Sequence, residues 1–171
     1  MFDRGYWHFA TVRGVPLRVH WSLPVGMLLM AGFSPVSWLA FLVIVLGHEA
    51  GHALLVRRYG FHVHAIDVHG FGGLTRWVGH ATPHERSVIA WGGVAAQGLL
   101  LVTTLALVIV FGWPTSWAGY ALARAFIYTN LFIMALNLLP FPPFDGAEAW
   151  RLARGWRDRL GGGPRGRFGG R

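Results

Sequence analysis

Residues 36–58 read VSWLAFLVIVLGHEAGHALLVRR, and this stretch decides what kind of chain surrounds it. Twelve apolar or small residues lead into His48, Glu49 and His52, and two arginines end the run. An apolar segment of about 20 residues is long enough to cross a hydrocarbon core about 30 Å thick. We therefore expect a membrane-crossing helix at about residues 36–56, with ionisable side chains in its second half.

The distribution of charge extends this interpretation to the whole sequence. Only 13% of the 171 residues are charged, about half the share that soluble domains carry, whereas 54% are hydrophobic. No Asp, Glu, Lys or Arg occurs within residues 19–48, 87–123 or 125–144. This pattern indicates an integral, polytopic membrane protein.

Breaks at glycine and proline divide the apolar sequence into four segments. The first is short, and it either crosses with help from residues 17–20 or only dips into the membrane. The predicted fold is an all-α polytopic membrane protein with about four transmembrane helices, at about residues 21–33, 36–56, 87–111 and 118–136.

Three smaller features complete the expected fold. Residues 59–86 alternate weakly around a glycine-rich turn, which predicts a short membrane-associated β-hairpin or an extended loop. Residues 15–19 predict a short strand, and residues 149–160 an interfacial amphipathic C-terminal helix. We expect one membrane-embedded domain over residues 1–160 and a disordered Gly/Arg-rich tail over residues 161–171.

The net charge of +8 does not indicate a nucleic-acid partner, because the arginines form no separate basic face. They cluster in residues 1–18, 57–86 and 151–171 and are absent from the loops at 33–37 and 112–118. Under the positive-inside rule, this bias predicts four crossings with both termini in the cytoplasm.

The sequence His48-Glu49-Ala50-Gly51-His52 is an H-E-x-x-H motif. Histidines four apart share one face of a helix, so His48 and His52 can bind the same zinc ion, and Glu49 can accept a proton from water. In an apolar helix these side chains cost several kcal/mol unless they face a polar cavity. The alternative is a helix end at which they only meet lipid headgroups.

A catalytic zinc site needs a third protein ligand, and Asp145 is the favoured candidate. It follows the prolines at 140, 142 and 143, which end the fourth expected helix near the cytoplasmic side. The predicted topology brings it to the depth of His48 and His52. The alternative is a turn aspartate in the Asp145-Gly146 pair.

Together these motifs resemble the site-2 protease family of intramembrane zinc metalloproteases. The resemblance covers about residues 12–152 and rests on four stretches: H-E-A-G-H at 48–52, N-L-L-P-F-P-P-F-D-G at 137–146, R-V-H-W-S at 18–22 and F-G-G at 71–73. The chain is similar to the compact core of that family, without a PDZ or CBS domain.

The resemblance implies one zinc per chain, bound by His48, His52 and Asp145. It also implies that Glu49 is the catalytic base and that Asn137 donates a hydrogen bond to the substrate; the alternative for Asn137 is a helix C-terminal cap. The implied activity is hydrolysis of peptide bonds in or beside transmembrane segments of membrane-bound substrates, as in regulated intramembrane proteolysis. A bacterial or archaeal cell membrane is the expected location, and a regulatory membrane partner or a homo-oligomer is left open.

The sequence departs from the family pattern in two places. Gly93-Val94 and Gln97 stand where members often have Gly-Pro followed by Asn, and Ala147 replaces a second glycine after Asp145.

Two other classes of function are considered, a zinc-binding membrane transporter or sensor and a catalytically inactive relative that binds transmembrane helices. Three histidines near the expected hairpin, His62, His64 and His69, suggest either a second metal site or, preferably, surface side chains. His20 faces either the cavity or the membrane interface.

Overall fold

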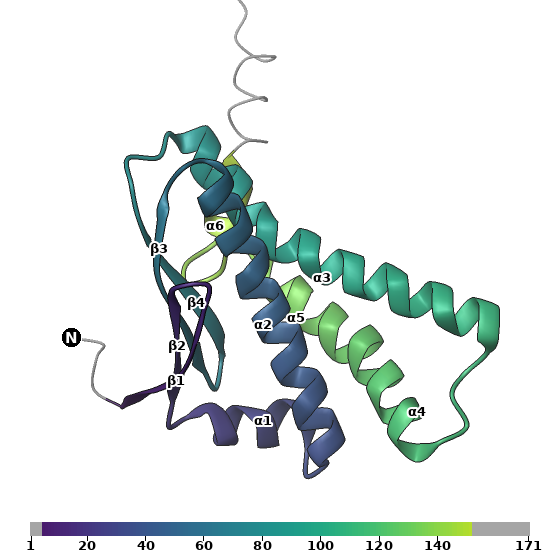
Figure 1. Cartoon of the computed structure of the whole chain (residues 1–171). Helices are drawn as coiled ribbons and strands as arrows, with labels where there is room; N and C mark the ends of the chain where they lie inside the picture. Colours follow the sequence, from purple (N-terminus) through teal and green to yellow (C-terminus); the bar gives the residue numbers. More distant parts are fainter. Residues whose placement is uncertain (1–4, 152–171) are drawn as a thin grey trace, which may run out of the picture.

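The structure is a computed structural model that describes residues 5–151. Its elements, in chain order, are β1 (Tyr6–Val12), β2 (Val15–His20), α1 (Leu23–Ala31), α2 (Pro35–Arg58), β3 (His62–His69), β4 (Gly72–Val78), α3 (Pro83–Phe111), α4 (Trp117–Arg124), the π-helical turn η1 (Ala125–Thr129), α5 (Asn130–Asn137) and α6 (Gly146–Ala149). The strands lie on one side of α2, and α3, α4 and α5 extend away on the other (Figure 1).

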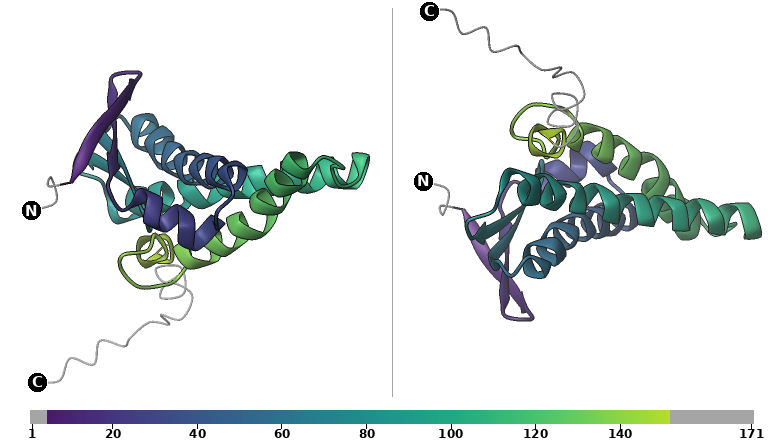
Figure 2. Two further views of the ribbon diagram at one scale, coloured as in Figure 1. Left: turned by 90° about the horizontal axis from the view of Figure 1, so that it is seen from below. Right: turned by 90° about the horizontal axis from the view of Figure 1, so that it is seen from above.

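Three helices in residues 5–151 are long and apolar enough to cross a membrane. They are α2 with 24 residues, α3 with 29, and the continuous segment Trp117–Asn137 with 21. The far half of α3 projects beyond the rest of the chain (Figure 2). Its side chains there are apolar and exposed, as at Ile109 and Phe111, so this surface suits lipid rather than water.

The first expected crossing is shorter than the other three. Helix α1 has nine residues, or about 14 Å, and cannot span a hydrocarbon core of about 30 Å. The described chain therefore has three candidate helical spans rather than four.

Strand β2 and helix α1 together run alongside α2, in the direction opposite to it. Arg57, at the end of α2, donates a hydrogen bond to the carbonyl of Arg13, in the turn before β2. From there β2 and α1 lead to Pro35, where α2 begins.

The β structure is larger than a hairpin, so the all-α description needs correction. Strands β3 and β4 occupy the expected hairpin, and β2 occupies the strand expected at residues 15–19. Strand β1 was not expected, and the four strands form one sheet in the order β1-β2-β3-β4. The central pair, β2 and β3, is parallel, and the two outer pairs are antiparallel.

Local sequence explains where the long helices begin. Ser34 accepts a hydrogen bond from the backbone of Ser37, and Pro35 opens α2 with its φ already fixed. Thr82 and Glu85 form a capping box at the start of α3, again followed by proline.

Two apolar clusters attach the sheet to α2. One joins α1, α2 and β3 and consists of Leu23, Met27, Phe41, Val45 and Val68. The other lies nearer the end of α2 and consists of Val15, Val56, Val63 and Ile89.

A buried ion-pair network ties three strands together. Asp67 in β3 is fully buried and accepts hydrogen bonds from Arg18 in β2, at 2.7 Å, and from Arg76 in β4. Both oxygens of the Asp67 carboxylate are therefore paired within the sheet.

Helices α2 and α3 cross in backbone contact at two glycines. A Cβ atom built on Gly51 would collide with the carbonyl oxygen of Gly92, and one on Gly92 would lie 2.6 Å from the carbonyl oxygen of Gly51. Such close approach at small residues is common between helices in lipid.

The expected interfacial helix at residues 149–160 and the Gly/Arg-rich tail at 161–171 lie outside the described residues, apart from the first three positions of that helix.

The glycine contact generates a stability prediction. Gly51→Ala should lower the free energy of unfolding by about 1–3 kcal/mol, because the new methyl group forces α2 and α3 apart. Gly47→Ala, one turn earlier, is the matched control. Nothing lies within 4 Å of that position, so the change should be neutral or stabilising by up to about 1 kcal/mol. Thermal unfolding of the detergent-solubilised protein measures both, and equal effects would contradict the contact.

Candidate metal centre

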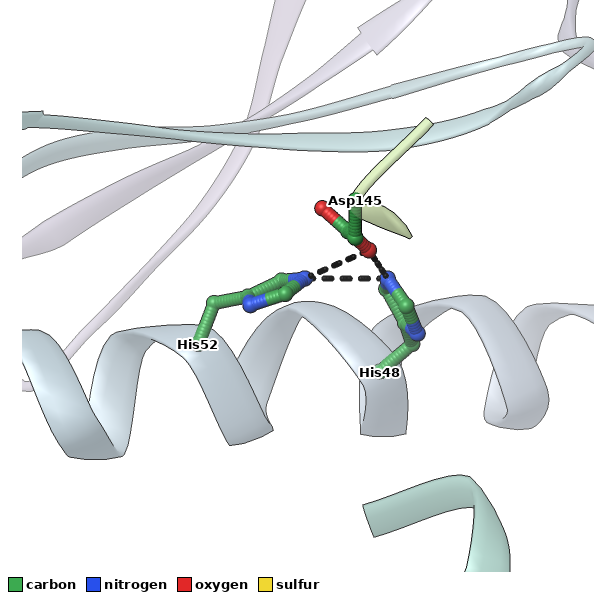
Figure 3. A group of neighbouring side chains, drawn as sticks. All are labelled: His48, His52 and Asp145. Carbon is green, nitrogen blue, oxygen red and sulfur yellow. Dashed lines mark hydrogen bonds and ion pairs between the residues drawn. The ribbon is translucent and has the colours of Figure 1, made fainter. Parts of the chain in front are cut away.

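Helix α2 presents two imidazoles on one face. His48 and His52 lie one turn apart, and both side chains are buried. Their Nε2 atoms are 3.0 Å from each other, on the side of α2 that faces Asp145 (Figure 3). This spacing brings two nitrogen lone pairs to one point.

The third group arrives from a segment more than 90 residues further along the chain. The Oδ2 atom of Asp145 lies 2.8 Å from Nε2 of His48 and 3.1 Å from Nε2 of His52. The structure thus brings the three residues predicted as ligands into one cluster (Figure 3).

The loop that carries Asp145 is fixed at both of its ends. Trp150 donates an indole hydrogen bond to the carbonyl of Leu138 at 2.7 Å, which closes the loop on the end of α5. Ser87 and Trp91 of α3 donate to the carbonyl of Ala149 at 2.7 and 3.1 Å. Asp145 is therefore held in place by α3 and α5.

The electrostatics keep Asp145 ionised. Burial raises the pKa of its carboxyl group, but the hydrogen bonds and charges of His48 and His52 lower it by more, so the pKa lies below its ordinary value. A carboxylate must be deprotonated to bind a metal.

The cluster could hold a single metal ion. Its three ligand atoms all lie within 4.8 Å of one another. Ligands of a tetrahedral zinc ion, at about 2.0–2.1 Å from the metal, are separated by about 3.3 Å, so only a small opening is needed. Two histidines and one carboxylate would leave the fourth position free, as in catalytic rather than structural zinc sites.

The Nδ1 atoms of both histidines are bonded to α3. His52 donates to the backbone carbonyl of Ile89 at 2.8 Å, and His48 donates to Oε1 of Gln97 at 3.0 Å. These bonds assign the protons to Nδ1 and leave both Nε2 atoms available to a metal.

Glu49 is buried beside the cluster and is held by β4. The hydroxyl of Thr75 lies 2.6 Å from Oε2 of Glu49 and 3.1 Å from the backbone carbonyl of the same residue. At Gly73 a Cβ atom would overlap the Glu49 side chain. The sheet therefore approaches α2 closely enough to fix the position of this carboxylate.

Asn137 lies at the end of α5, at the margin of the cluster. Its Nδ2 atom is 3.5 Å from Nε2 of His48. One amide donor thus faces the point where the three ligand atoms meet.

The chain is similar to known proteins in fold and in sequence. The fold matches the solved structure of a site-2 protease from Methanocaldococcus jannaschii with a TM-score of 0.69, at 21% identity, over 89% of this chain and 73% of that one. A protein of Mycobacterium tuberculosis named zinc metalloprotease Rip3 is 35% identical over 151 residues, which cover 86% of this chain. The chain therefore has the fold of that site-2 protease and is similar in sequence to Rip3.

A further relative and the shares of each protein that are covered describe how far the similarity extends. A zinc metalloprotease of Methanocaldococcus jannaschii is 25% identical over 150 residues, or 82% of this chain. The chain spans 35% of the length of Rip3 and 43% of the length of the archaeal relative. No family model matches the chain.

Three residues around the candidate site had no predicted role in it. Gln97 stood out in the sequence as a departure from the family pattern and as a polar residue in an uncharged apolar run, and the second signal could have led to it. No sequence signal separated Thr75 from other strand residues. The collision of a Cβ at Gly93 with the ring of His48 likewise follows only from the packing of α3 on α2.

The remaining histidines form no second cluster of three metal-binding side chains within residues 5–151. His62 and His64 are exposed on β3. The Nδ1 atom of His69 accepts a backbone hydrogen bond from Phe71 at 3.2 Å, and Nδ1 of His20 lies 2.8 Å from the hydroxyl of Ser22. These contacts favour the interpretation as surface and turn side chains.

The contact at Gly93 generates a prediction about metal binding. Gly93→Ala should displace the ring of His48 and weaken binding of Zn²⁺ about tenfold or more, as disturbed supporting contacts commonly do. Gly98→Ala on the same helix is the control, because nothing lies within 4 Å of that position. Competition with a chromophoric chelator measures both affinities, and unchanged affinity in a folded Gly93→Ala protein would contradict the packing described.

Proposed function

We propose that this chain is a zinc metalloendopeptidase that hydrolyses peptide bonds in or next to transmembrane segments of membrane-bound substrates. The observation that carries the proposal is the convergence of His48, His52 and Asp145 beside the buried Glu49, within helices suited to a membrane. The names of the relatives, zinc metalloproteases and a site-2 protease, support the same activity.

One zinc ion per chain is the proposed cofactor, with His48, His52 and Asp145 as its ligands. Such an ion would lower the pKa of a water molecule and polarise the carbonyl group of the scissile peptide.

Glu49 is the proposed general base and general acid. Its carboxylate accepts the proton that the attacking water loses and returns it to the leaving amine. The hydroxyl of Thr75 donates to Oε2 of Glu49, which leaves Oε1 free to accept that proton.

Asn137 is the proposed hydrogen-bond donor to the substrate. Its amide lies beside His48, where it can stabilise the negative charge that develops on the carbonyl oxygen of the peptide.

The substrate is proposed to bind in an extended conformation along β4. This strand is at one edge of the sheet, and Thr75 contacts Glu49 from it. A helical transmembrane segment hides its peptide bonds, so it must unwind before cleavage, and an edge strand offers main-chain partners to the unwound segment.

The alternatives receive less support. A transporter or sensor would place further metal ligands along a path, but within residues 5–151 the chain forms one group of three. The amide of Gln97, the side chain that could have extended such a path, is bonded to His48. An inactive relative that only binds transmembrane helices would have no use for the orientation of Glu49.

We propose that the protein lies in a bacterial or archaeal cell membrane with both termini and the segment 57–86 in the cytoplasm. Arg13 and Arg57 meet at one end of α2, whereas the loops at 33–34 and 112–116 carry no charge. On this proposal β2 and α1 take the place of the first crossing helix.

Cysteine labelling tests the orientation, since the chain has no cysteine of its own. In intact cells a membrane-impermeant maleimide should label Phe33→Cys and Thr115→Cys, and it should label His80→Cys only after permeabilisation. All three positions are exposed. Labelling of His80→Cys alone in intact cells would reverse the proposed orientation.

A panel of variants tests the proposed activity. Glu49→Gln should retain one zinc per chain and lose cleavage, because Glu49 moves protons and binds no metal. Asp145→Ala should lose both. Asn137→Ala should retain zinc and lower turnover about 100- to 1000-fold. The measurements are zinc content of the purified protein and cleavage of a model transmembrane substrate.

Glu148→Gln, three residues beyond Asp145, is the matched control and should retain both properties. Full zinc occupancy in Asp145→Ala would refute its role as a ligand, and loss of zinc from folded Glu49→Gln would refute the role given to Glu49.

A further inference from the structure

Gln97 is a buried amide in the middle of a membrane-crossing helix. Its side chain is 1% exposed, and the stretch of α3 around it, from Ser87 to Phe111, carries no charged residue. An amide removed from water costs several kcal/mol unless it is hydrogen-bonded. Within residues 5–151 its side chain makes one hydrogen bond, to a proposed metal ligand, with 3.0 Å between Oε1 of Gln97 and Nδ1 of His48.

The direction of this hydrogen bond follows from the other side of the imidazole ring. Nε2 of His48 faces Asp145 at 2.8 Å, so a metal bound there requires the lone pair of Nε2. The proton of the neutral ring then sits on Nδ1, and Oε1 of Gln97 accepts it.

The two histidines differ in what holds them. The acceptor for Nδ1 of His52 is the backbone carbonyl of Ile89, which every residue type provides. The acceptor for Nδ1 of His48 is a side chain. The tautomer of His48 therefore depends on the identity of residue 97, whereas that of His52 does not depend on the identity of residue 89.

Helix α5 secures the turn of α3 that carries Gln97. Asn130 is fully buried and donates from Nδ2 to the backbone carbonyl of Gln97 at 2.9 Å. Asn130 directly follows the π-helical turn η1, and Asn137 comes two turns later on the same face of α5. One face of α5 thus reaches both Gln97 and the metal cluster.

We propose that Gln97 is the positioning residue of the metal centre: it sets the tautomer and ring orientation of His48, so that Nε2 binds the metal. This role rests on the proposed zinc site. It also explains why the chain tolerates a buried amide in an apolar span, since supporting partners of metal-bound histidines increase metal affinity.

The test compares two replacements at residue 97 in the purified chain of 171 residues. Gln97→Met preserves the length of the side chain but removes the carbonyl acceptor, and it should weaken Zn²⁺ binding about 10- to 100-fold. Gln97→Glu keeps an acceptor oxygen and should retain or exceed wild-type affinity, because a carboxylate is a common partner of metal-bound histidine. The affinities are measured by competition with a chromophoric chelator.

Thr104→Val is the matched control. Thr104 is a buried polar residue two turns further along the same helix, and its hydroxyl donates to the carbonyl of Leu100 within α3. Loss of this hydroxyl should leave the affinity for Zn²⁺ unchanged. Thermal unfolding of every variant shows whether it is folded.

A Gln97→Met protein with wild-type zinc affinity would overturn the proposal. Equal weakening in Gln97→Met and Gln97→Glu would also overturn it, because the acceptor oxygen, which only the glutamate retains, would then not determine the affinity. A wild-type chain that binds no Zn²⁺ would instead refute the proposed function itself.

A spectroscopic measurement on the wild-type protein covers the case in which Gln97→Met does not fold. In ¹⁵N spectra of histidine-labelled, zinc-loaded protein, Nδ1 of His48 should carry a proton, with the resonance assigned by its loss in His48→Gln. An unprotonated Nδ1 would overturn the proposal without any variant at residue 97.

Discussion

The four ring nitrogens of His48 and His52 impose the constraint on which the rest of the structure depends. They are polar atoms in an apolar helix, and each must find a partner that water cannot supply. Helix α3 supplies an acceptor to each Nδ1 atom, and Asp145 faces both Nε2 atoms. Because these partners come from residues 89, 97 and 145, satisfying one pair of side chains fixes the relative positions of three distant segments.

Close approach of backbones makes this arrangement sterically accessible. Gly51 and Gly92 let α2 and α3 touch, Gly93 leaves room for the ring of His48, and Gly73 lets β4 reach Glu49. At each of these glycines a Cβ atom would collide with another segment. The segments that form the site can therefore approach one another only because these residues have no side chain. The packing that stabilises the helices in lipid is therefore the same packing that positions the site.

Local sequence predicts much of the architecture. Long uncharged runs predict α2, α3 and the segment that contains α4 and α5, since each residue there must be both apolar and internally hydrogen-bonded in lipid. The turn at 70–73 predicts the hairpin of β3 and β4. The four-stranded sheet was not predictable in the same way, because the parallel pairing of β2 with β3 joins strands separated by two helices. The sequence showed that the first apolar segment is short but left open whether it crosses, because apolar composition does not distinguish a helix that crosses from one that lies beside a sheet.

The sequence by itself determined the membrane class, the family resemblance and the choice of His48, Glu49 and His52 as candidate site residues. These follow from composition and from spacing along one helix, which are local properties. Only the tertiary structure decided that Asp145 reaches the two histidines, that Thr75 orients Glu49 and that Gln97 bonds to His48. Each of these contacts joins atoms that are far apart in the chain, and no local periodicity encodes such a distance. They exist because α3, β4 and the loop after α5 pack against the same two turns of α2.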